Sequence, residues 1–164
     1  MKADEIRDGV SDWIPFLKVS DARWLGFVGQ DLWTSDSFGR SRRVNLECPI
    51  SLLPVLERGR RQVLEDLEGF KTDLSFMFQY TQDFSWIDSV AEYACRSPIS
   101  EYWITLALKW MEEKESLTDS EIDILRELSR WRKAQKIQHH ARRVLRKHPD
   151  GCPWNTRRVS GPTS

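Results

Sequence analysis

The sequence has few cysteines and no long apolar run. Its three cysteines, Cys48, Cys95 and Cys152, are odd in number and widely spaced, unlike the paired framework of a disulfide-stapled secreted domain, so we expect reduced thiols. No window reaches the roughly 18 apolar residues of a membrane span, and the N-terminal residues form no apolar signal-peptide core. We therefore expect a cytoplasmic protein without a membrane partner.

Motifs that carry chemistry are also missing. GxSxG, HExxH, a phosphate-binding glycine loop and a CxxC pair do not occur. His139, His140 and His148, together with Cys152, raise the question of zinc. Adjacent histidines diverge by about 100° on a helix, and structural zinc uses closely spaced ligand pairs. We expect no metal, no cofactor and no catalytic residue, and we interpret the histidines as solvated.

The residues that are present indicate a globular chain. Of 164 residues 40% are hydrophobic and 30% charged, and the eight tryptophans are more than average. We predict one domain over residues 1–148 and a flexible tail over 149–164, which is rich in Pro, Gly, Ser and Thr. Periodicity does not predict burial for Trp13, Trp24, Trp33 and Trp154, and two or more of them exposed together would mark a contact surface.

Apolar spacing predicts a mainly α fold, a helical bundle, with an α+β fold containing a few short N-terminal strands as the alternative. Aromatic and β-branched residues favour strands at 23–29 and 43–48. Helices are expected at 49–69, 83–95 and 98–116, and weakly at 73–82. In the third of these, Ser97 and Pro98 would begin the helix, and Trp103, Leu106 and Trp110 would be buried on one stripe.

The last predicted helix has the clearest start signal. Thr118 and Glu121 form a capping box, so we predict a helix that begins there and continues past Ala141. A short polar connection before it predicts an antiparallel helix hairpin over 98–147. The apolar stripe moves by more than 90° near Arg132, which indicates either a bend or contact with two different neighbours.

Charge is segregated along the chain although the formal net charge is zero. From residue 129 onward the chain has ten basic residues and one acidic residue, Asp150. The preceding part has 15 basic and 24 acidic residues. On a helix the basic residues lie opposite an apolar sector, so they form one positive face. The predicted partner-binding residues are the seven cations of this face: Arg132, Lys133, Lys136, Arg142, Arg143, Arg146 and Lys147.

Three interpretations of this face remain open. The cations can be a solvated face balanced by the protein's own acidic surface, they can bind another protein, or they can bind nucleic acid. Cations near a helix C-terminus also complement the helix dipole, which explains some segregation without any partner. By exclusion the sequence favours a non-catalytic protein-binding module, such as an inhibitor or a toxin-neutralising immunity protein, with a nucleic-acid-binding regulator as the alternative. The sequence does not predict an oligomeric state.

Overall fold

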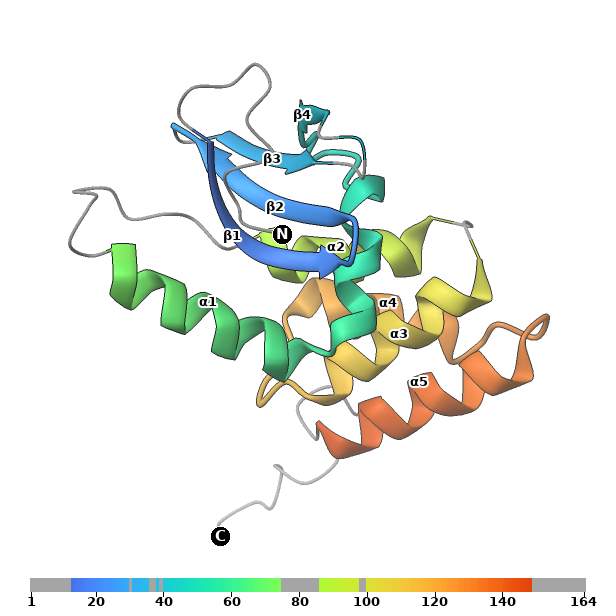
Figure 1. The fold of residues 1–164 in the computed structure, drawn as a ribbon. Helices are drawn as coiled ribbons and strands as arrows, with labels where there is room; N and C mark the ends of the chain where they lie inside the picture. The colour runs from blue at the N-terminus through green and yellow to red at the C-terminus, as the bar shows by residue number, and fades with distance from the viewer. Residues whose placement is uncertain are drawn as a thin grey trace, which may run out of the picture.

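An antiparallel sheet with helices on one side makes up the fold of the computed structural model (Figure 1). The predicted helices are present, and the four-stranded sheet in the N-terminal third agrees with the predicted α+β alternative, so the mainly α prediction is confirmed only in part. The described residues are 13–29, 31–35, 38, 40–74, 86–97 and 100–148, with the backbone alone for 71–74. The predicted element at 73–82 and the tail at 149–164 lie outside them, apart from the last two residues of the first long helix.

The strands follow one another in the order β1-β2-β3-β4. Alternate residues of the central strands, such as Leu25, Phe27 and Leu32, are buried on the face that meets the helices. The strand predicted at 43–48 is wrong beyond its first residue, because the Asn45 side chain accepts a hydrogen bond from the Glu47 N–H and turns the chain. The strands are β1 (Trp13–Ser20), β2 (Arg23–Val28), β3 (Asp31–Ser35) and β4 (Ser41–Arg43).

The tryptophans of the sheet do not form an exposed patch. Trp13 is buried, and its ring lies so close to Gly26 that a Cβ at Gly26 would approach the ring carbons to 2.7 Å. Trp24 and Trp33 are half-buried, and Trp154 lies outside the described residues. The condition for a tryptophan contact surface is therefore not met by the three tryptophans that the structure places.

The helix predicted at 49–69 is two elements. The 3₁₀ helix η2 (Ile50–Arg58) ends at Gly59, and α1 (Arg60–Leu74) follows. Gly59 has a φ of 77°, a left-handed conformation that glycine adopts readily and that interrupts the helix. The apolar positions on both sides of Gly59 nevertheless face the same core: Leu52, Leu56, Val63 and Leu67 are buried, and Phe70 is partly buried against them.

Helix α2 (Trp86–Arg96) confirms the prediction at 83–95, with its predicted apolar face buried. Helix α3 (Glu101–Glu112) begins later than predicted, since its cap is Ser100, whose hydroxyl accepts a hydrogen bond from the Trp103 N–H. Of the predicted stripe Trp110 is buried, whereas Trp103 and Leu106 are only half-buried. The sector that α3 buries against α2, η2 and α5 (Gln135–Lys147) is wider and lies to one side of the predicted stripe.

The last predicted helix is also two elements. The capping box of Thr118 and Glu121 is confirmed at the start of α4 (Asp119–Leu128), but the helix ends there and α5 begins only after residues 129–134. The moving apolar stripe was the signal of this break. Glu112 at the end of α3 contacts residues of the last turns of α5, so α3 and α5 run in the same direction. The predicted hairpin of two helices is instead three helices, in which α5 packs against both α3 and α4.

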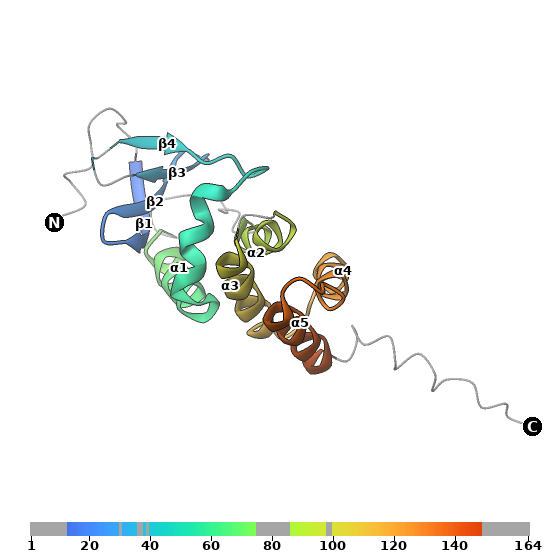
Figure 2. The same cartoon turned by 90° about the vertical axis from the view of Figure 1, so that its right-hand side faces the viewer.

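Layers follow one another from the sheet outward in the view of Figure 2. The sheet lies at one end with η2 and α1 against it, α2 and α3 follow, and α4 and α5 lie at the far end. One hydrophobic cluster nevertheless includes residues from β1 through to α5. No helix within the described part of the chain has the length and apolarity required to cross a bilayer.

Candidate functional site

The predicted basic face exists, and the apolar sector behind it is the one expected. Ile137, Ala141, Val144 and Leu145 of α5 are buried, and all seven predicted cations are exposed. The break before α5 divides these cations between two places. Arg132, Lys133 and Lys136 lie at the turn between α4 and α5 and in the first turn of α5, while the other four lie in its last two turns.

The distal cations are bound to the protein itself. An Arg143 guanidinium nitrogen lies 2.9 Å from a carboxylate oxygen of Glu112, and the Lys147 ammonium donates to the Glu112 backbone carbonyl. Arg142 Nε donates to the carbonyl of Ser129 over 3.1 Å. Arg146 Nε donates to the Arg142 carbonyl over 3.3 Å. For this half of the face the internally balanced interpretation describes the structure.

Glu112 is the carboxylate that balances the distal half. Burial raises the pKa of Glu112, but hydrogen bonds from Arg143 and His140 outweigh that effect and hold the pKa below its ordinary value. The Nε2 atom of His140 lies 3.1 Å from the carboxylate, so His140 is not a solvated residue as predicted. His148 is buried as well, and only His139 is exposed as the sequence interpretation required.

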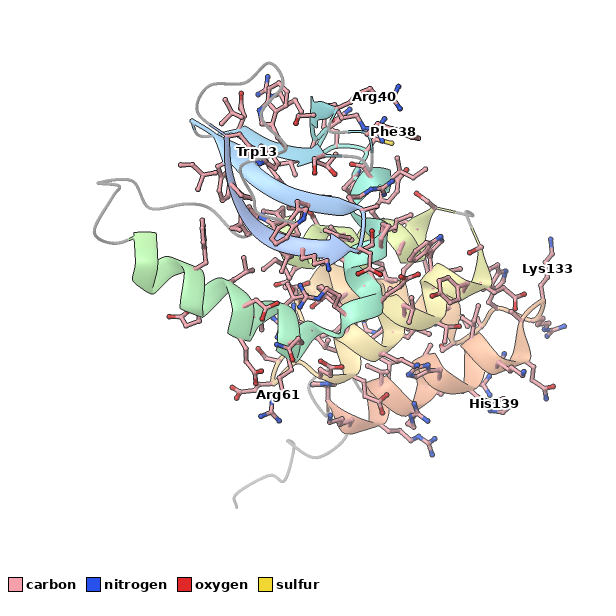
Figure 3. The ribbon with its side chains drawn as sticks, in the orientation of Figure 1. Trp13, Phe38, Arg40, Arg61, Lys133 and His139 are labelled. Atoms are coloured by element: carbon pink, nitrogen blue, oxygen red, sulfur yellow. The ribbon has the colours of Figure 1, made fainter. Side chains whose placement is uncertain are left out.

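The other three predicted cations, Arg132, Lys133 and Lys136, lie beside a fourth, Arg130. We call these four residues the turn cluster. All four side chains are exposed, and within the described part of the chain none makes a hydrogen bond or ion pair. Glu127, the nearest acidic residue in the sequence, forms no ion pair with them in that part of the structure. Figure 3 shows Lys133 pointing away from the body of the protein.

The helix dipole does not explain the turn cluster. Lys133 precedes α5 and Lys136 lies in its first turn, where the partial positive charge of the helix N-terminus makes a cation unfavourable by about 0.3 to 1 kcal/mol. Ala134 caps this end without a side-chain hydrogen bond, and no acidic residue lies in the first turn. The sequence interpretation assumed one continuous helix, in which all these cations would lie toward the C-terminus.

Backbone hydrogen bonds hold the turn that carries the cluster. The N–H groups of Arg130 and Trp131 donate to the carbonyls of Glu127 and Leu128 over 3.0 and 3.1 Å. Trp131 is half-buried against the core, and Ala134 is buried. Sequence reasoning missed Arg130, which lies outside the helix face that was used to select the cations. The signal that could have identified Arg130 was its position in the basic run RWRK, residues 130–133.

A second charged site lies in a groove of about 1120 Å³ between the start of α1 and the connection from α3 to α4. The buried Lys114 ammonium lies 2.8 Å from Glu121 and 3.1 Å from Asp88, and Asp88 lies 3.6 Å from Arg60. A carboxylate oxygen of Glu113 accepts the Arg61 N–H at the start of α1. These ion pairs and the hydrogen bond connect α1, α2, α4 and the α3–α4 connection, so we assign the groove a structural role.

Metal ligation finds no support in the described residues, where no group of three or more His, Cys, Asp and Glu side chains is placed to hold an ion. Cys152, which was weighed as a zinc ligand together with the histidines, lies outside the described part of the chain.

The two described cysteines should differ in reactivity. Burial, with a smaller contribution from the carboxylates of Glu121 and Glu92, raises the pKa of the Cys95 thiol to about 12. Cys48 is exposed. Because the thiolate is the reactive form, we expect a thiol reagent at pH 8 to modify Cys48 rapidly and Cys95 only after unfolding. The measurement is labelling followed by peptide mass spectrometry, in which rapid labelling of Cys95 in the folded protein would contradict its burial.

No protein-family model, curated protein or solved structure matches this chain.

Proposed function

We propose that the protein is a non-catalytic binding module that docks on an acidic surface of another protein through the turn cluster. The observation that carries the proposal is the contrast between the two halves of the basic face. The distal cations are engaged by Glu112 and by backbone carbonyls, whereas Arg132, Lys133 and Lys136 have no partner among the described residues and lie where the helix dipole opposes them. Cations that the fold does not use are available to a partner.

A protein partner fits this site better than a long nucleic acid. The chain has no net charge, and acidic residues of α3, α4 and their connection, such as Glu115 and Asp123, are exposed. A polyanion that extended beyond the cluster would meet these like charges. The half-buried Trp131 beside the exposed Arg130 and Arg132 matches the enrichment of aromatic residues and arginine at protein interfaces. An inhibitor or a toxin-neutralising immunity protein is the role that this module would suit.

Two matched variants test the proposal. The turn variant replaces Arg132, Lys133 and Lys136 by glutamine, and the distal variant replaces Arg142, Arg143 and Lys147 by glutamine, so each removes three positive charges. We expect both to fold with stability within about 1 kcal/mol of the parent, because exposed ion pairs and dipole effects are individually small. The turn variant should lose the partner, and the distal variant should keep it.

The measurement is capture from a lysate of the native host, with short duplex DNA and structured RNA titrated in parallel at two salt concentrations. We expect an acidic protein that the parent and the distal variant recover and the turn variant does not. Nucleic-acid binding that weakens steeply with salt would favour the regulator alternative, because counterion release links affinity to salt. Equal capture by both variants would contradict the proposal.

A further inference from the structure

A small pocket lies at the sheet end of the protein, away from α5, where β2, β3 and β4 meet. Its volume is about 380 Å³, toward the small end of the range for ligand pockets. The groups that line it are guanidinium and hydroxyl groups, and no carboxylate among the described residues takes part. The lining residues are Arg23, Thr34, Ser35, Arg40, Ser41 and Arg42.

Strand register brings two of the arginines to one face of the sheet. Thr34 of β3 pairs directly with Arg42 of β4, and on its other side Thr34 pairs with Leu25 of β2. Arg23 lies two residues before Leu25, so it projects from the same face as Thr34, at a diagonal position. Arg23 and Arg42 thus lie on either side of Thr34 and both line the pocket, and neither side chain makes a hydrogen bond or ion pair with the described residues.

Two of the hydroxyl-bearing residues that line the pocket are buried. Thr34 is 3% exposed and Ser35 1% exposed. The Ser35 hydroxyl projects to the other face of β3 and accepts a hydrogen bond from the Trp24 N–H over 3.2 Å. Thr34 Oγ1 lies 3.5 Å from the Ser35 carbonyl, at the limit of a hydrogen bond. The pocket therefore offers donors to a ligand rich in acceptor oxygens.

An aromatic ring lies at the side of the pocket. Phe38 is 80% exposed, and the guanidinium carbon of Arg40, which lines the pocket, is 5.2 Å from the centre of its ring. Figure 3 shows Phe38 and Arg40 side by side at the edge of the sheet. Exposed aromatic rings beside cations form stacking platforms for flat rings such as nucleobases.

We propose that this pocket binds the phosphate group of a small phosphomonoester that carries a flat ring, the chemistry of a mononucleotide. Arginine matches the geometry of phosphate because its planar fork donates two parallel hydrogen bonds. Arg23 and Arg42 hold the phosphate from two sides, the buried Thr34 hydroxyl donates from below, and Phe38 stacks against the ring. This site is separate from the turn cluster, so the test of the pocket is independent of the proposed function.

Calorimetric titration of the full chain tests the proposal, at constant ionic strength, with inorganic phosphate, adenosine monophosphate, adenosine and acetate as probes. We expect phosphate to bind, adenosine monophosphate to bind more tightly, and adenosine and acetate to bind at least about tenfold more weakly than the nucleotide, since each charge-assisted interaction contributes about that factor. Binding of adenosine or acetate as tight as that of the nucleotide would overturn the proposal.

A neighbouring arginine supplies the matched control. Arg42→Gln and Arg23→Gln should each weaken phosphate and nucleotide binding by about tenfold or more. Arg43→Gln removes the same charge from the next residue of β4, which projects to the other face and pairs with Asp31 over 2.7 Å, and it should leave both affinities unchanged. Phe38→Ala should weaken only the nucleotide. Equal losses in Arg42→Gln and Arg43→Gln would show general electrostatic attraction instead of a pocket, and unchanged binding in Arg23→Gln and Arg42→Gln would exclude the site.

Discussion

Replacing Glu121 by alanine should lower the free energy of unfolding by about 3 to 5 kcal/mol, because it leaves a buried cation without its closest partner. The Glu121 side chain is 0% exposed. One carboxylate oxygen lies 2.8 Å from the Lys114 ammonium, and the other accepts the Thr118 N–H over 2.9 Å. The substitution therefore removes an ion pair and half of the capping box of α4 together.

Chemical denaturation of the parent, Glu121→Ala and Glu121→Gln measures this loss. Glutamine keeps an oxygen for the Thr118 N–H but removes the charge that faces Lys114, so Glu121→Gln should lie between the other two. Asp88, 3.1 Å from the ammonium and partly exposed, is then the remaining counter-charge. If the free energy of unfolding of Glu121→Ala lies within about 1 kcal/mol of that of the parent, the ionic site does not hold α4 in place.

The second large effect is expected at Trp110 in α3. Trp110→Ala should cost about 3 to 5 kcal/mol, as the truncation of a large core side chain does. The residue is buried, and its indole N–H donates to the carbonyl of Leu56 in η2 over 3.0 Å. This contact joins the middle helix layer to the element beneath the sheet, so the loss should affect the whole cluster.

Two comparisons make this prediction specific. Trp110→Phe keeps most of the packing and loses only the N–H donor, so it should be less destabilising than Trp110→Ala. Trp103→Ala should also cost less, since Trp103 is half-buried and packs edge-to-face on the exposed Tyr102 with ring centres 4.9 Å apart. Thermal and denaturant unfolding of the three variants give the order, and a Trp103→Ala loss as large as that of Trp110→Ala would contradict the observed burial.

Local signals predicted the helices well and their interruptions poorly. The capping box at Thr118 and the apolar sector of α5 depend on residues close in sequence, and the structure confirms both. The break at Gly59 was missed because the apolar positions before and after it keep the same helical spacing. That spacing therefore predicts one continuous helix. The break after Leu128 did leave a signal in the sequence, because the apolar stripe changes its position around the helix near Arg132. The structure shows that this change marks two separate helices and not a bend.

The sites were harder to predict than the elements. Lys114 and Glu121 are seven residues apart, but only the turn between α3 and α4 buries them together with Asp88 of α2. The division of the basic face depends on the direction of α3, which brings Glu112 to the distal cations. Contacts of this kind come from the packing of separate elements, and no pattern of residue types along the chain specifies them.

Site-specific photo-crosslinking tests the central claim, docking through the turn cluster, most directly. A photoreactive residue is placed at Lys133, which points outward, or at Arg61, an exposed control position at the start of α1 (Figure 3), and each protein is irradiated in the native host. We expect a protein adduct at position 133 that disappears when Arg132 and Lys136 are changed to glutamine, and none at position 61. An adduct of equal yield at both positions, a nuclease-sensitive adduct, or none at position 133 would contradict the claim.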